Sequence, residues 1–281
     1  MELPKVGFIG AGKVGITLGR YFAENEIPII GFYSKTETSS KQAAYITGSK
    51  SLSLEEVIQA SNLLFITVPD FVLPEVWERV RTFNLEGKEV CHCSGSLTSF
   101  VFNDIEFKGA KGFSLHPLCA IHDLYSSYMK MEAVHFTLEG PRGGKYLHNL
   151  LRILDNPVEH IAPENKVLYH TAAVFCSNLV IGLAKMGSDL LKDSGLSDEF
   201  ALHAWRGLFE RNAQNIVERG LIPSLTGPIE RGDDSTVKSH LSSLHGSHLQ
   251  VYQILSQELI ALAKEKHPER DFSNIEEVLK R

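Results

Sequence analysis

The sequence KVGFIGAGKVG, residues 5–15, decides the fold of the N-terminal half. Residues 5–9 predict a short β-strand, and a glycine-rich turn follows it directly at residues 10–15. Apolar residues then recur at helical spacing as far as Phe22, and residues 27–33 (IPIIGFY) predict a second strand. A G-x-G-x-x-G motif inside a strand–helix–strand unit of about 30 residues is typical of dinucleotide-binding proteins, whereas the bare motif is weak evidence.

The alternation of strands and helices continues to about residue 160. Ser53 and Glu56 have the spacing of a capping box, which predicts a helix start, and Pro74 suits the first turn of another helix. Short apolar runs predict further strands at residues 63–68, 89–93, 110–115, 134–138 and 158–161. The pattern predicts an α/β fold for residues 1–162, a doubly wound, Rossmann-type and mostly parallel sheet.

The second half has a different pattern, which predicts an all-helical C-terminal domain over residues 163–281. One long helix is expected at residues 164–194, with others at 198–218, 235–245 and 248–266, and a short exposed tail helix after His267-Pro268. Apolar residues surround most of the long helix, so it must be buried on more than one side. We therefore expect a homodimer formed through this substrate and dimerisation domain.

Composition excludes several classes of function. The 28 basic and 34 acidic residues give a net charge of −6. A negative net charge does not indicate a protein that binds nucleic acid. No apolar run reaches the roughly 18 residues expected of a membrane span. The four cysteines do not form a disulfide framework, which favours a protein of the reducing cytoplasm. The partner that we expect is a small-molecule substrate.

The glycine-rich turn is the expected cofactor-binding segment. Gly10 permits the tight turn, Gly12 lets the backbone approach a pyrophosphate, and Gly15 allows the helix to pack closely on the strand. Lys13 and Val14 open the helix whose N-terminus supplies N–H groups and the positive end of its dipole.

The residues after the second strand indicate which nucleotide is bound. An NAD enzyme usually places Asp or Glu here, but this chain has Ser34, Lys35 and Thr36. Two hydroxyls and a cation suit a 2′-phosphate, so we expect NADP. Glu37 lies slightly later and supports the alternative, because its carboxylate is within reach of a ribose.

Ligands of a doubly wound sheet bind outside the carboxyl ends of its strands. Polar clusters follow three strands at these ends, at residues 67–70, 94–96 and 114–117. We expect Val68, Pro69 and Ser94 to contact the cofactor. Ser96 and His116 are candidate catalytic residues, because a histidine at a strand end suits acid–base work. The alternative for His116 is a structural histidine bonded to backbone before a proline turn.

The combined motifs resemble a known family. GFIGAGKVG, ITVPD, HCSGSLTS, SLHPL, YHTAAVFCSN and LTGPIERGD resemble Rossmann-like NADP oxidoreductases that have a helical C-terminal domain of unknown function. More distantly, the chain is similar to ketopantoate reductase, pyrroline-5-carboxylate reductase and prephenate or arogenate dehydrogenase. The resemblance implies NADP binding and a helical domain that mediates dimerisation, and it implies no substrate.

Two further features are carried over from the resemblance. Ser96 with His116-Pro117 is similar to the serine turn and His-Pro pair that face substrate and nicotinamide in prephenate-type dehydrogenases. His170 and Asn178 occupy the places of a catalytic lysine and an asparagine in ketopantoate reductase, and histidine in place of lysine is a departure. The alternative is that both are interface or capping residues of a buried helix.

A metal site is not expected, although Cys91, Cys93, Cys119 and His116 supply the right atoms. A Cys-x-Cys pair on a strand places two thiols on one face, and small buried cysteines are common.

The expected function is hydride transfer between NADPH and a small carbonyl or imine substrate in an interdomain cleft. The polar residues His116, Ser96, His170 and Asn178 favour this enzyme. The alternative is a non-catalytic NADP-binding sensor or scaffold, which the absence of a fixed lysine at residue 170 leaves open.

Overall fold

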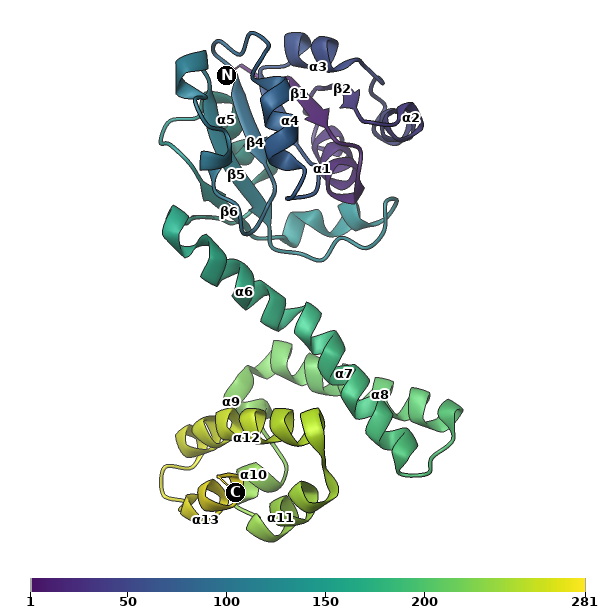
Figure 1. Ribbon diagram of the computed structural model, residues 1–281, viewed down its shortest axis with the longest axis vertical. Coiled ribbons are helices and arrows are strands. Elements are labelled where there is room, and N and C mark those ends of the chain that lie inside the picture. Colours follow the sequence, from purple (N-terminus) through teal and green to yellow (C-terminus); the bar gives the residue numbers. More distant parts are fainter. Residues whose placement is uncertain (1, 281) are drawn as a thin grey trace. The chain divides into compact units, whose positions relative to one another are not determined.

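The chain divides into two compact units, Met1–Ser177 and Asn178–Arg281, and the computed structural model describes residues 2–280 of it (Figure 1). We expected a helix at residues 164–194 to begin the C-terminal domain. Its residues up to Ser177 belong instead to the first unit. The division of the chain into domains at residues 162 and 163 stays a prediction.

The first unit is built on one seven-stranded sheet of order β2-β1-β3-β4-β5-β6-β7. All neighbouring strands are parallel except β6, which is antiparallel to β5. The predicted doubly wound, mostly parallel sheet is therefore confirmed. The strands are β1 (Val6–Ile9), β2 (Ile29–Tyr33), β3 (Leu63–Ile66), β4 (Glu89–His92), β5 (Lys111–Pro117), β6 (Phe136–Glu139) and β7 (Val158–His160).

Helices cover both faces of this sheet (Figure 1). One face packs against α1 (Lys13–Glu24) and α5 (Lys145–Leu154), around a core that includes a stacked pair of rings, Phe8 and Phe32, 4.7 Å apart. The other face packs against α3 (Leu54–Ala60) and α4 (Leu73–Val80). The unit is completed by α2 (Glu37–Thr47), α6 (Lys166–Cys176) and 3₁₀ turns at Ser99–Val101, Glu106–Lys108, Ser127–Ala133 and Pro163–Asn165.

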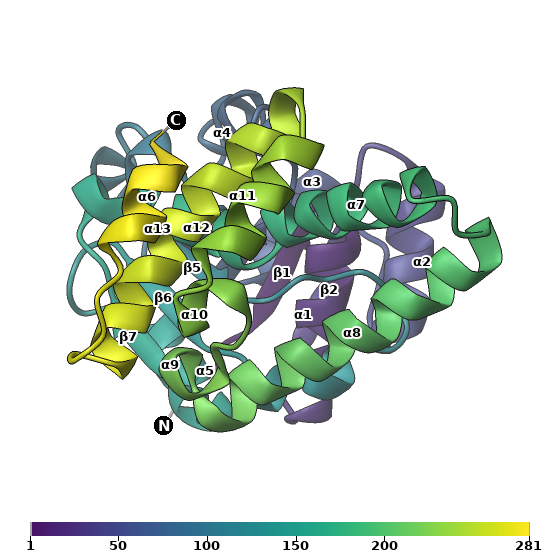
Figure 2. The same ribbon diagram turned by 90° about the horizontal axis from the view of Figure 1, so that it is seen from below.

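The second unit is helical, as predicted. Its core joins the C-terminal helices, and Figure 2 shows α10, α11, α12 and α13 gathered together. The expected exposed tail is wrong, because Ile275, Val278 and Leu279 of the last helix are buried in this core. The helices are α7 (Asn178–Asp193), α8 (Asp198–Arg219), α9 (Leu221–Ser224), α10 (Pro228–Arg231), α11 (Asp234–Ser243), α12 (Gly246–Lys266) and α13 (Ser273–Leu279).

The long helix expected at residues 164–194 is interrupted. Ser177 has φ −131° and ψ −80°, outside the helical region, and it separates α6 from α7. By length and composition alone, the segment Pro163–Asp193 is long and apolar enough to cross a membrane. Its most apolar window of 18 residues has a mean hydropathy of 1.6, and none of that window is buried. This finding corrects the expectation that no apolar segment is long enough for a membrane span. A single such helix is weak evidence of a membrane span.

A buried carboxylate fixes α5 against the sheet. Glu89 begins β4 and is 4% exposed. Its two carboxylate oxygens accept hydrogen bonds from the backbone N–H groups of Tyr146 (3.1 Å) and Leu147 (2.7 Å), which lie in the first turn of α5. A negative charge at this end also complements the helix dipole.

Glu89→Gln is expected to lower the free energy of unfolding by about 1.5–3 kcal/mol, because it removes a charged acceptor from one buried and one half-buried N–H donor. Urea unfolding followed by circular dichroism measures this loss. The matched control is Glu55→Gln on the exposed surface of α3, expected to change stability by no more than about 0.5 kcal/mol. Equal effects of the two substitutions would contradict a role for Glu89 as the cap of α5.

Candidate functional site

The glycine-rich turn is held against the end of β3 by a close contact. The hydroxyl of Thr67 donates a hydrogen bond of 2.8 Å to the carbonyl oxygen of Gly10, whose φ is +111°. A Cβ added at Gly15 would lie 2.4 Å from that hydroxyl, too close for any side chain. A Cβ at Gly12 would meet only the Thr67 carbonyl oxygen, at 3.9 Å. Packing therefore requires glycine at residues 10 and 15, whereas residue 12 has open space in front of it.

That space belongs to a cavity of about 310 Å³ at the carboxyl ends of β1, β3 and β4. Strand order reverses between β1 and β3, where nucleotides bind in doubly wound folds. Six predicted cofactor-binding residues line this cavity together: Gly12, Lys13, Val14, Val68, Pro69 and Ser94.

The turn after β2 is exposed and leads into α2. Lys35 and Thr36 are exposed, and no side chain caps the N-terminus of α2. The Thr36 hydroxyl lies 2.7 Å from that of Ser39. Glu37, the residue that favours NAD, forms an ion pair of 2.7 Å with Lys41, and this contact lowers the pKa of its carboxyl group.

Asp70 organises the serine turn that follows β4. Its Oδ2 accepts hydrogen bonds from the hydroxyls of Ser94 (2.6 Å) and Ser96 (3.2 Å). The Ser94 oxygen in turn accepts from the backbone N–H groups of Ser96 and Leu97. Ser94 N–H donates to Nδ1 of His92, whose Nε2 faces the Thr98 carbonyl oxygen, so the hydrogen bonds assign the proton to Nε2. Burial lowers the pKa of His92 to about 4, and this histidine is a neutral structural group.

One face of β5 and β6 is polar. Ser114 pairs with Glu139 and His116 pairs with Thr137 across the two strands, and directly paired residues project on the same side. The alternate residues of both strands belong to the apolar core on the other side. A buried polar surface therefore lies under the start of α6.

Lys166, the first residue of α6, contacts this polar surface. It is 1% exposed, and its ammonium group donates hydrogen bonds to the Ser94 carbonyl oxygen (3.0 Å) and the Ser114 hydroxyl. Within residues 2–280, the structure shows no carboxylate at ion-pair distance from it. Burial lowers the pKa of Lys166. A buried ammonium group without a carboxylate partner is costly, which marks the surroundings as a candidate functional site.

His116 and His170 lie side by side, 5.9 Å apart between ring centroids and nearly perpendicular. Nδ1 of His116 is 2.7 Å from the hydroxyl of Tyr169. Nδ1 of His170 is shielded from solvent without a hydrogen-bond partner in the described chain. Gly95 leaves room for both rings, because a Cβ there would lie 2.5 Å from Nδ1 of His170 and 3.0 Å from Nε2 of His116.

His116 is neutral at physiological pH. Its pKa is lowered from 6.5 to about 4, first by burial, then by the positive charge of Lys166 and by His170. The imidazolium form therefore becomes populated only in acid.

The structure brings the predicted residues together in two pairs. Ser94 and Ser96 share Asp70 as a hydrogen-bond acceptor, and His116 lies beside His170. Asn178 is the first residue of the second unit, so its predicted place beside His170 stays a prediction. Sequence reasoning placed Asp70 in the polar cluster at residues 67–70 without giving it a role, and it missed Lys166 and Tyr169. Lys166, Tyr169 and His170 have i, i+3, i+4 spacing, which places them on one face of a helix and was the available signal.

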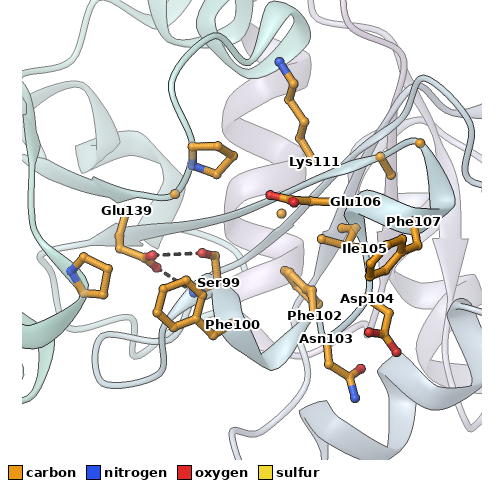
Figure 3. Close-up of a pocket in the computed structure, with 16 residues that line it drawn as sticks. Ser99, Phe100, Phe102, Asn103, Asp104, Ile105, Glu106, Phe107, Lys111 and Glu139 are labelled. Atoms are coloured by element: carbon orange, nitrogen blue, oxygen red, sulfur yellow. Dashed lines mark hydrogen bonds between the residues drawn. The ribbon is translucent and has the colours of Figure 1, made fainter.

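A larger hollow of about 740 Å³ lies elsewhere in the first unit (Figure 3). Figure 3 shows Glu139 beside Phe100, with its carboxylate accepting hydrogen bonds from the Ser99 N–H (2.6 Å) and hydroxyl (2.8 Å). No predicted site residue lines this hollow. Among residues 2–280 no group of three or more metal-ligating side chains is found.

Family models match both halves of the chain. A Rossmann-like domain covers residues 2–117, and a domain of unknown function, DUF2520, covers residues 134–259. The chain joins a Rossmann-like domain to a DUF2520 domain. The predicted resemblance is thereby confirmed. No curated protein sequence matches the chain.

Solved structures share this two-domain fold. Protein TM1727 from Thermotoga maritima has a TM-score of 0.72 and 25% identity, covering 93% of this chain and 99% of its own. BF3122 from Bacteroides fragilis, proposed as an NADP oxidoreductase, has a TM-score of 0.68 and 22% identity, covering 92% and 98%. Pyrroline carboxylate reductase from Plasmodium falciparum with NADP bound has a TM-score of 0.56 and 14% identity, covering 94% and 99%. The fold is thus one that NADP-dependent reductases use.

Lys166→Met is expected to raise the pKa of His116 above about 4, because a nearby positive charge opposes protonation, while burial, the larger cause, keeps this pKa below 6.5. The histidine signals in an NMR pH titration measure this shift, and Lys166→Gln is a second variant in case methionine disturbs folding. Lys111→Met, at the opposite end of β5, is the control and should leave the pKa of His116 unchanged. An unshifted His116 in folded Lys166 variants would contradict the electrostatic link.

Proposed function

We propose that the protein is an NADP-dependent oxidoreductase that transfers a hydride between NADPH and a small carbonyl or imine substrate. The observation that carries the proposal is the place of the neutral His116, whose Nδ1 lies beside the Tyr169 hydroxyl. His116 is on β5, and the neighbouring strand β4 leads to Ser94, which lines the cavity next to Gly12. The related folds that bind NADP support it.

The residues present fit an NADP cofactor. The open space at Gly12 and the N-terminus of α1 suit a pyrophosphate, which backbone N–H groups there would hold. Ser34, Lys35 and Thr36, with the uncapped N-terminus of α2, suit a 2′-phosphate. Glu37 is engaged by Lys41, which weakens the case for NAD. When bound, the cofactor supplies the hydride.

The chain's own residues supply the proton that a reduced carbonyl oxygen or imine nitrogen must gain. Neutral imidazole is able to donate a hydrogen bond to such an atom, as a neutral histidine does in triosephosphate isomerase. Burial raises the pKa of Tyr169, so its hydroxyl keeps its proton at neutral pH and donates to Nδ1 of His116. The proton of His116 is then on Nε2, which lies next to the backbone of Gly95. We propose that His116 donates its Nε2 proton to the substrate as the hydroxyl proton of Tyr169 passes to Nδ1. Water then returns a proton to the Tyr169 oxygen, because this side chain is only half-buried.

Two other residues orient the site. Lys166 fixes the ends of β4 and β5 through Ser94 and Ser114, and its charge adds to the effect of burial in lowering the pKa of His116. His170, whose Nδ1 has no hydrogen-bond partner in the described chain, binds the substrate's polar group.

The alternative from another class is an NADP-binding sensor without turnover. It predicts tight NADPH binding and no substrate-dependent NADPH consumption across a broad panel of small carbonyls and imines. Consumption with any member of the panel excludes it.

His116→Ala is expected to lower kcat by about 10²–10⁴, because general acid catalysis contributes that much, while NADPH affinity is kept. Tyr169→Phe should also lower kcat, and His170→Ala should mainly raise KM. Steady-state kinetics and NADPH calorimetry measure both quantities, with the exposed His160→Ala as control. If His116→Ala retains kcat within about twofold, too small a loss for a general acid, His116 is structural.

The wild-type protein is expected to prefer NADPH over NADH by about tenfold or more, or about 1.4 kcal/mol. Ser34→Asp should reverse the order, because its carboxylate repels a 2′-phosphate and bonds a ribose hydroxyl. Calorimetry with both nucleotides tests this, and Ser194→Asp in the second unit is the control. Equal affinities of the wild-type protein for the two nucleotides would refute the choice of NADP.

We also propose a twofold homodimer through the second unit. The second unit, taken by itself, leaves apolar side chains of α7 and α8 exposed, including Ile181, Leu208 and Val217. Monomeric proteins rarely expose so many large apolar residues together, and a second copy would cover them.

Light scattering at micromolar concentration should give about twice the chain mass of 31.3 kDa. Leu208→Glu with Val217→Glu should shift the protein toward monomer, whereas Phe107→Glu, an equally exposed position of the first unit, should not. A wild-type mass of one chain would contradict the dimer, and association with lipid vesicles instead would favour a membrane-bound helix.

A further inference from the structure

Arg79 lies in the last turn of α4 and reaches the end of β2. Its guanidinium group donates a hydrogen bond of 2.9 Å to the hydroxyl of Tyr33, and its central carbon is 5.8 Å from the centroid of that ring. Tyr33 is the last residue of β2 and directly precedes the turn formed by residues 34–36. A cation is therefore held next to the turn by a side chain of another element.

Arg79 differs from its neighbour Arg81 in one respect that bears on ligand binding. Arg81 forms ion pairs with Glu78 (3.1 Å) and Asp104 (2.8 Å), so protein carboxylates already neutralise its charge. Across residues 2–280 the structure shows no ion pair for Arg79. Its fork of N–H donors is only partly used, by a neutral hydroxyl.

The surroundings of the turn carry excess positive charge. Lys35 is exposed, and within the described part of the chain it too has no ion pair. The carboxylate that directly follows the turn, Glu37, is already paired with Lys41. Two uncompensated cations at the end of β2 are typical of a site for an anion with more than one negative charge.

We propose that Arg79 is a specificity-determining residue, whose guanidinium group binds the 2′-phosphate of the adenosine half of NADP together with Lys35. This inference rests on the proposed NADP-dependent function. The planar guanidinium group matches a phosphate with two parallel hydrogen bonds, which an ammonium group does not provide. Tyr33 positions Arg79, because its hydroxyl accepts a hydrogen bond from the guanidinium group and its ring lies beside that group.

The experiment compares Arg79→Gln with Arg81→Gln, two residues apart at the same helix end. Calorimetry gives Kd for NADPH and NADH and for two simpler probes, adenosine 2′,5′-bisphosphate and 5′-AMP. Arg79→Gln should weaken NADPH and the bisphosphate by about tenfold or more, since a hydrogen bond between charged groups contributes that much, and leave NADH and 5′-AMP within about twofold. Arg81→Gln should change none of the four.

Three further variants and conditions sharpen the result. Arg79→Lys keeps the positive charge but lacks the two parallel N–H donors of the guanidinium group, so it should keep only part of the affinity for NADPH and the bisphosphate. Tyr33→Phe should give a smaller loss than Arg79→Gln, again confined to the 2′-phosphorylated ligands. Raising the salt concentration should weaken NADPH binding more in the wild-type protein than in Arg79→Gln, because screening acts on the missing contact. Unchanged Tm values establish that each variant is folded.

The outcomes separate this inference from the proposed function. If the wild-type protein prefers NADPH and Arg79→Gln keeps that preference, the role of Arg79 is overturned while NADP binding stands. Equal losses for NADPH and NADH would also overturn it, because Arg79 would then act on the shared adenosine. If the wild-type protein itself binds both nucleotides equally, the choice of NADP fails first.

Discussion

The hydroxyl of Thr67 lies between the backbone of Gly10 and the start of α1, and the rest of the site depends on that contact. It ties the turn after β1 to the end of β3 at the point where strand order reverses. No side chain fits at Gly15 while the contact is made. The same contact aligns the N-terminus of α1 with the ends of β3 and β4, so that one cavity collects residues from three segments far apart in sequence.

A second constraint acts on the neighbouring strands. Lys166 is a buried cation that joins the end of β4 to β5 through Ser94 and Ser114. Burial of the site and then the positive charge of Lys166 keep His116 neutral, and its Nδ1 lies 2.7 Å from the hydroxyl of Tyr169. The proton chemistry proposed for His116 thus follows from how the sheet is held together.

Periodicity and local motifs were enough to predict the sheet of the first unit, because strands, caps and the glycine-rich turn are set by short-range chemistry. All seven strands and the capping box at Ser53 are present. Tertiary contacts decided the rest. The last helix was expected to be exposed, yet three of its apolar residues enter the core of the second unit. Lys166 and Tyr169 were missed because their importance comes from β5 and β6, more than 25 residues earlier in the chain.

The central claim, a nucleotide site built at the glycine-rich turn, is tested most directly by Gly12→Val. Gly12 has extended backbone, φ −83° and ψ −176°, and an added Cβ contacts nothing closer than 3.9 Å, so the apo protein should fold with Tm changed by no more than about 3 °C. A side chain there would nevertheless occupy the space of the pyrophosphate. Calorimetry should show one NADPH bound per wild-type chain and affinity at least about tenfold lower in the variant. Unchanged NADPH affinity in a folded Gly12→Val protein would contradict the account.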